Sequence, residues 1–190
     1  MKNEHKKFFF KKSKILKLFL ISPFLVSIPF FSNNEVNAGL EFQWDQDSGY
    51  RRLKWFQKNN VRRRRNTIFF FLRPSDRKAG LLKISMKIPK TFKSTIKEKK
   101  VSLCKVKIGG FESRTKCIAD IPSDIELNED KTSLDIYPYN PIPSNKDSYA
   151  IVFKVFNPNK TGLYQFHSYG QYIGGNTVSS YLGSSTLVID

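Results

Sequence analysis

Basic side chains are the residues of this 190-residue chain whose types and spacing most clearly suggest chemistry. They form two neighbouring groups, which are Arg51, Arg52 and Lys54, then Arg62, Arg63, Arg64 and Arg65. Because guanidinium groups bind phosphate and carboxylate through paired hydrogen bonds, these groups predict a surface for an anionic partner. A plainer interpretation also remains open. Four consecutive arginines cannot all face a core, and charges on a loop or an edge strand keep sheet edges from aggregating.

Two tryptophans, Trp44 and Trp55, lie beside the first basic group. Their rings could stack on sugar rings, since both stand among polar residues. The alternative is that they pack against the domain and hold the preceding segment in place.

The two cysteines, Cys104 and Cys117, are predicted to form a disulfide. If the segment 101–118 is a hairpin whose turn is centred between Gly110 and Phe111, the cysteines are equally distant from the turn. Directly opposite residues of a hairpin have Cβ atoms about 4.5–5.5 Å apart, close enough for a disulfide in an oxidising compartment. Metal binding is the weaker alternative, because further ligands are missing. We expect neither a metal nor a cofactor.

His167 is the one imidazole of the chain after residue 38 that could serve an enzyme. The sequence has no nucleophile elbow, phosphate-binding loop or His-Glu zinc motif, so a non-catalytic protein is favoured. The alternative is a periplasmic hydrolase or transferase that uses His167 with a carboxylate. A pocket containing His167 and an Asp or Glu would favour that alternative.

Residues 1–38 have the organisation of a secretory signal peptide. Lysines precede an apolar run of 14 residues, 18–31, which contains two prolines and is followed by Val36-Asn37-Ala38. A membrane-spanning helix needs about 20 apolar residues, so we expect cleavage between Ala38 and Gly39 instead of an anchor. The mature protein is then exported by the general secretory route to the periplasm or the outer cell envelope.

The net charge of the chain is +17. Seven lysines and two glutamates in residues 1–38 account for +5 of it, which leaves +12 for residues 39–190. A basic protein in the envelope meets lipopolysaccharide, acidic glycans, anionic lipids or acidic proteins, so we expect one of these as the partner. Nucleic acid is excluded by the compartment, and membrane contact is expected only transiently, through the signal peptide.

The stretch 149–171 is the expected centre of the fold. It has two aromatic strands joined by a polar loop at 157–162, and Tyr149, Ile151, Phe153 and Val155 share one face of the first strand. Other apolar or alternating segments bring the total to about seven to nine strands, which predicts an all-β fold, a single Ig-like or Greek-key β-sandwich. We place a basic, aromatic leader arm at 39–66 and the sandwich at 67–190. One helical turn is expected at 91–96 and a turn at 121–124.

The C-terminal third resembles a known family. The matching motifs are Phe156-Asn157-Pro158, then Gly162-Leu163-Tyr164-Gln165-Phe166, and Tyr181-Leu182-Gly183 near the C-terminus. They are similar to a cyanobacterial secreted family known only as domain of unknown function 2808, and the resemblance covers most of residues 61–190. It implies a cyanobacterial envelope protein with a β-rich domain, and it brings no catalytic residues.

Overall fold

The computed structural model of the chain describes residues 49–175 and 177–190, so the expected signal peptide, its cleavage position and Trp44 lie outside the described residues. The described part lies within one compact unit, Gln43–Asp190, which has a hydrophobic core of its own. Its strands are β1 (Trp55–Gln57), β2 (Arg65–Leu72), β3 (Leu81–Lys87), β4 (Val101–Lys107), β5 (Lys116–Ile121), β6 (Ser123–Leu127), β7 (Ser133–Pro138), β8 (Tyr149–Phe156), β9 (Gly162–Tyr172) and β10 (Ser180–Ile189). Two 3-10 helices, η2 (Pro74–Asp76) and η3 (Glu98–Lys100), lie between strands.

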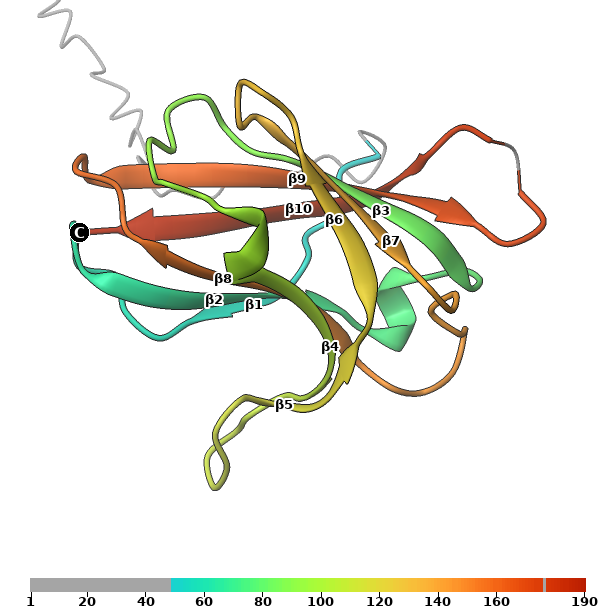
Figure 1. Cartoon of the computed structure of the whole chain (residues 1–190). Coiled ribbons are helices and arrows are strands. Elements are labelled where there is room, and N and C mark those ends of the chain that lie inside the picture. Colours follow the sequence, from blue (N-terminus) through green and yellow to red (C-terminus); the bar gives the residue numbers. More distant parts are fainter. Residues whose placement is uncertain (1–48, 176) are drawn as a thin grey trace, which may run out of the picture. The chain divides into compact units, whose positions relative to one another are not determined.

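The ten strands form two five-stranded antiparallel sheets that pack face to face (Figure 1). One sheet has the order β1-β2-β8-β4-β5, and we call it the β8 sheet. The other has the order β10-β9-β3-β7-β6, and we call it the β9 sheet. The predicted all-β sandwich is confirmed, with more strands than the seven to nine expected because several segments break into short pieces.

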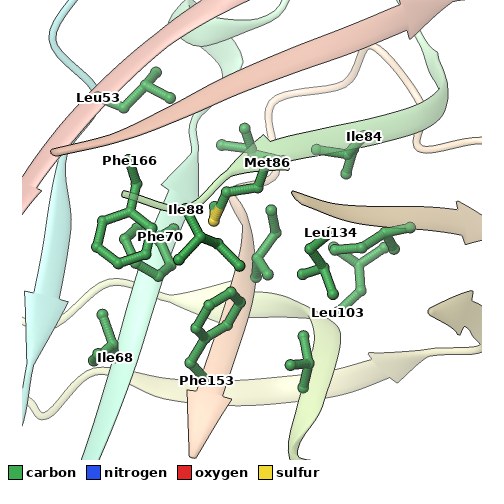
Figure 2. Close-up of a cluster of buried hydrophobic side chains, with 14 of the residues drawn as sticks. Leu53, Ile68, Phe70, Ile84, Met86, Ile88, Leu103, Leu134, Phe153 and Phe166 are labelled. Carbon is green, nitrogen blue, oxygen red and sulfur yellow. The ribbon is translucent and has the colours of Figure 1, made fainter. Parts of the chain in front are cut away.

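The core lies between the sheets and is built from the side chains at alternate positions along the strands, which point inward. Phe70 and Phe153 come from the β8 sheet, and Phe166 comes from the β9 sheet (Figure 2). The ring of Phe70 lies 5.2 Å from that of Phe153 and 4.9 Å from that of Phe166, between centroids. Strands β8 and β9 therefore face each other across the core, although only a short loop joins them. The predicted inward face of β8 is correct, since Tyr149, Ile151, Phe153 and Val155 are all buried in this core.

Two chain segments pass from one sheet to the other and cover the edges of the sandwich. Arg52 bridges to Ser184 of β10, after which β1 pairs with β2. At the opposite edge, β5 pairs with β4 and β6 pairs with β7, with only Pro122 between them. The expected turn at 121–124 is therefore wrong: proline removes one backbone donor, and the strand bends there and continues in the other sheet.

The described part of the expected leader arm is built into the sandwich. Leu53 is 2% exposed in the core, and the partly buried ring of Trp55 packs against the same core. Apolar side chains at alternate positions make this segment an edge strand.

The segment between β3 and β4 has no helical turn at 91–96, so that expectation is also wrong. Phe92 and Ile96 are nevertheless both buried, and the Phe92 ring lies 5.0 Å from that of Phe166. The two side chains hold the irregular segment 88–97 against the core, and Lys93 and Lys97 of this segment are exposed. We call this segment the strap.

Cys104 and Cys117 form a disulfide with their Cα atoms 5.7 Å apart. The register of the hairpin differs from the predicted one, because Cys104 pairs with Asp120 and Cys117 pairs with Val106. A bulge lies between these pairs, and it brings the two cysteines together diagonally. Both sulfurs lie on the outer face of the β8 sheet, in a small apolar cluster that includes Phe69, Phe71 and Val152.

We predict that removing the disulfide lowers the free energy of unfolding of residues 39–190 by about 2–3 kcal/mol, because it closes a short loop in the unfolded chain. Urea unfolding of the oxidised protein, the reduced protein and C104A/C117A tests this. Equal midpoints for the oxidised and reduced proteins would contradict the prediction.

Candidate functional site

The arginine run lies in an exposed loop at one end of the β8 sheet. Arg62, Arg63 and Arg64 are exposed in the turn between β1 and β2, and Arg65 opens β2. Arg63 adopts a positive φ of 58°. This location agrees with the plainer interpretation, in which the arginines stand on a loop or an edge strand, since the inward positions begin only at Asn66, which is buried.

Two buried asparagines hold this loop in place. The Asn157 side chain donates to the carbonyl oxygens of Asn59 at 3.0 Å and Val61 at 2.8 Å. Its own oxygen accepts a hydrogen bond of 2.9 Å from Asn66. Asn66 in turn accepts from the backbone N–H of Asn59 at 3.1 Å. The amides satisfy backbone groups that no strand pairs, so they fix where the arginines emerge.

Beside this loop, basic side chains from three strand regions line one hollow of about 340 Å³. Its lining residues are Arg65, Asn66, Thr67, Lys100, Lys154, Val155 and Phe156. Thr67 pairs with Lys154, and Lys100 directly precedes Val101, which pairs with Phe153. Thr67, Lys154 and Lys100 therefore form a row across β2, β8 and the start of β4, on the outer face of the β8 sheet.

An aromatic ring completes this hollow. Phe156 is 54% exposed, and the guanidinium carbon of Arg65 lies 5.6 Å from the centroid of its ring. The stacked ring restricts the guanidinium group and leaves its hydrogen-bond donors free for a ligand. We call Arg65, Lys100, Lys154 and Phe156 the basic hollow.

The cations of the basic hollow have no acidic partner within the described residues. The ion pairs found there join Arg73 to Asp76, Lys83 to Asp135 and Lys105 to Asp147. Like charges on adjacent strands destabilise a sheet. An anion that binds between Lys100 and Lys154 would relieve this repulsion.

Lys100 and Lys154 were not among the predicted site residues. The sequence contains a signal for the first of them, because residues 90–100 have five lysines and a single glutamate. No local sequence signal indicates Lys154 as a site residue. It lies near Arg65 only because β2 pairs with β8.

The other predicted basic group lies at the far end of the same sheet. Phe71 of β2 donates its backbone N–H to the carbonyl of Lys54. Phe71 is six residues along the strand from Arg65, so Lys54 lies about 20 Å from Arg65.

A separate hollow of about 610 Å³ lies at this end, lined by Arg52, Lys54 and Trp55 together with Arg73. Arg73 is already paired there, and its hydrogen bond with Asp76 raises its pKa. Arg51 donates to the carbonyl of Ser75 at 3.0 Å. The structure thus divides the single predicted basic face into two.

His167 has a serine partner and no carboxylate partner among the described residues. Its Nδ1 lies 2.6 Å from Oγ of Ser184, and that hydroxyl lies 2.6 Å from the Tyr181 hydroxyl. Ser184 is 0% exposed, and burial raises the pKa of Tyr181. The described residues therefore do not assemble the His-carboxylate pair that the enzyme alternative requires, because β10 places serine opposite His167.

The described residues contain neither a metal-binding cluster nor a membrane-spanning helix. No group of three or more His, Cys, Asp or Glu side chains within residues 49–175 and 177–190 could hold a metal ion. The same part of the chain contains no helix with the length and apolar character needed to cross a bilayer.

The sequence matches the family described as a protein of unknown function (DUF2808) over residues 45–189. The chain belongs to this family. The match includes both basic groups, Asn157 and the two cysteines. The family resemblance expected from the C-terminal motifs is thereby confirmed. No curated protein matches the sequence.

Several solved structures are weakly similar. A bacterial hydrophobin, BslA, is 10% identical over 73% of this chain and 97% of its own, with a TM-score of 0.45. An uncharacterised Nocardia farcinica protein with an immunoglobulin-like fold is 10% identical over 73% and 97%, with a TM-score of 0.44. The collagen-binding domain of a Staphylococcus aureus adhesin is 13% identical over 71% and 95%, with a TM-score of 0.39. Because these scores are all below 0.5, the assignment of the sandwich rests on its own strands.

We predict that Asn157→Ala lowers the free energy of unfolding by about 2–4 kcal/mol, because it removes the side-chain bonds to the part-buried carbonyls of Asn59 and Val61 and leaves the buried Asn66 amide without its partner. Urea unfolding measures the loss. Asn159→Ala is the matched control, since Asn159 is exposed and accepts only a bond of 3.2 Å from Arg63. Equal stability of the two variants would contradict the role given to Asn157.

Proposed function

We propose that this protein is an exported, non-catalytic protein of the cell envelope that binds an anionic component through the basic hollow and the adjacent loop Arg62–Arg64. The partner is lipopolysaccharide, an acidic glycan, an anionic lipid or an acidic protein. The observation that carries the proposal is the meeting of Arg65, Lys100 and Lys154 around an exposed aromatic ring, where none of the three forms an ion pair with a carboxylate of the described residues.

The chemistry of the hollow favours a phosphate or carboxylate group carried on a sugar. Arg65 presents a planar fork, whereas Lys100 and Lys154 offer point charges on either side of a carboxylate or phosphate. The exposed ring of Phe156 is suited to the apolar face of a sugar. Three exposed arginines in the neighbouring loop extend the positive surface, so a polymer with repeated charges would bind more tightly than a single anion.

Support for a non-catalytic role comes from the surroundings of His167. Its serine partner is buried, and its side chain lines neither of the two hollows described above. Export rests on the sequence of residues 1–38.

Residues 39–190 should bind immobilised polygalacturonate, a polymer of uronic acids, and release it as salt is raised. We predict that R65Q/K100Q/K154Q weakens this binding at least tenfold, because each lost charge-assisted bond is worth roughly 1.5–3 kcal/mol. The measurement is the dissociation constant at low and near-physiological ionic strength.

The matched control is R52Q/K54Q/K78Q, which removes the same charge from exposed positions outside the basic hollow: Arg52 and Lys54 at the other end of the sheet, and Lys78 between η2 and β3. It should keep most of the affinity. Equal losses in the two triple variants would show that net charge alone is responsible and would overturn the assignment of the basic hollow.

A further inference from the structure

The tip of the β4–β5 hairpin carries an apolar side chain that packs against nothing in the described structure. Phe111 is fully exposed, with a relative exposed area of 107%, and Ile108 and Ile118 of the same hairpin are 37% and 58% exposed. The hairpin extends away from the body of the sandwich at the bottom of Figure 1. Single exposed apolar residues are common on protein surfaces, so the feature to explain is that three of them share one projecting hairpin.

Cations surround this tip. Lys107 and Lys116 lie opposite each other at the ends of β4 and β5, and Arg114 lies in the loop between them. All three are exposed, and none forms an ion pair with a described carboxylate. Glu112 is the one acidic residue of the loop 108–115.

A disulfide and hydrogen bonds within the loop hold the tip. The Cys104–Cys117 disulfide joins the two strands near its base. Within the loop, Gly110 donates its N–H to the carbonyl of Ser113 at 2.9 Å, and Gly109 donates to the Thr115 hydroxyl at 3.0 Å. A Cβ on Gly109 would lie 2.5 Å from the backbone nitrogen of Thr115, so the loop closes this tightly only with glycine there. Cross-links of this kind reduce the conformational entropy that a loop loses when it binds.

We propose that the β4–β5 hairpin is a membrane-contact element, in which Phe111 enters the headgroup region of an anionic bilayer while Lys107, Arg114 and Lys116 contact lipid phosphates. The site is separate from the basic hollow, which lies at the other end of β4 beside Lys100. It differs from the expectation that membrane contact occurs only through the signal peptide.

Charge and shape favour a lipid surface over a protein groove as the occupant. Aromatic rings flanked by lysine and arginine are typical of segments that lie in the bilayer interface, where the ring is buried and the charges stay at the headgroups. Each basic residue near an anionic leaflet adds to the attraction. The exposed apolar group is small and has the Phe111 ring at its tip, so it gives a protein partner little area to pack against but suits a fluid interface.

The direct test uses residues 39–190 with vesicles of pure phosphatidylcholine or of phosphatidylcholine with phosphatidylglycerol. We expect binding to the anionic vesicles only. Phe111→Ser should weaken it by roughly tenfold without changing the unfolding midpoint, because Phe111 makes no packing contact in the folded domain. Unchanged binding of F111S would overturn the proposal, since the remaining attraction would come from charge alone.

A spectroscopic measurement separates insertion of the tip from adhesion of the whole basic surface. In F111W, the added indole emission should shift to shorter wavelength with anionic vesicles and be quenched by lipids brominated on their acyl chains. V178W, at an exposed position of the β9–β10 loop, is the matched control and should show neither effect. An F111W that behaves like V178W would refute insertion.

Binding at the basic hollow and binding at the β4–β5 hairpin can be tested separately. R65Q/K100Q/K154Q should keep the F111W emission shift even where its binding to polygalacturonate is lost, and F111S should keep the binding to polygalacturonate. Loss of the emission shift in R65Q/K100Q/K154Q would assign vesicle binding to the basic hollow and overturn the hairpin proposal.

Discussion

The structure depends on the burial of aromatic side chains between two sheets whose edges would otherwise remain open. Phe70, Phe153 and Phe166 touch across the layers, and such rings exclude water only if the sheets stay aligned. Continuous segments maintain this alignment at both edges, through Arg52 and β1 on one side and through β5 and β6 on the other. Each covers an unpaired row of backbone groups and ties one sheet to its partner.

The strand order of the β8 sheet also determines where the basic side chains lie. Because β2, β8 and β4 are neighbours in one sheet, their outward positions form rows, and residues far apart in sequence become adjacent. Lys100 and Lys154 are brought beside Arg65 in this way. Asn66 and Asn157 follow directly after Arg65 and Phe156, and their buried amides hold the arginine loop in place by hydrogen bonds. One end of the sheet thus combines buried amides that fix the backbone with exposed cations that a ligand can reach.

Much of the fold could be predicted from alternation of apolar residues, and much less of the site. The inward face of β8 follows from Tyr149, Ile151, Phe153 and Val155, because a strand repeats every two residues. The pairing of Cys104 with Cys117 could be anticipated from a hairpin, but its register could not, since a bulge leaves no local pattern. Phe92 and Ile96 have the spacing of a helical pair, but the segment is irregular, because burial of Phe92 against Phe166 outweighs the local preference for a helical turn. The division of the basic residues into two groups required the strand register, which places Lys54 and Arg65 at opposite ends of β2.

The central claim, that the basic hollow holds an anionic ligand, is tested most directly by mapping where a small ligand binds. We would titrate isotope-labelled residues 39–190 with a short uronic-acid oligosaccharide and follow the backbone amide signals by NMR. The largest shifts should lie in residues 62–67, 99–101 and 153–157, around Arg65, Lys100 and Lys154. Shifts concentrated around Arg52, Lys54 and Thr115, or the absence of any localised shifts, would contradict it.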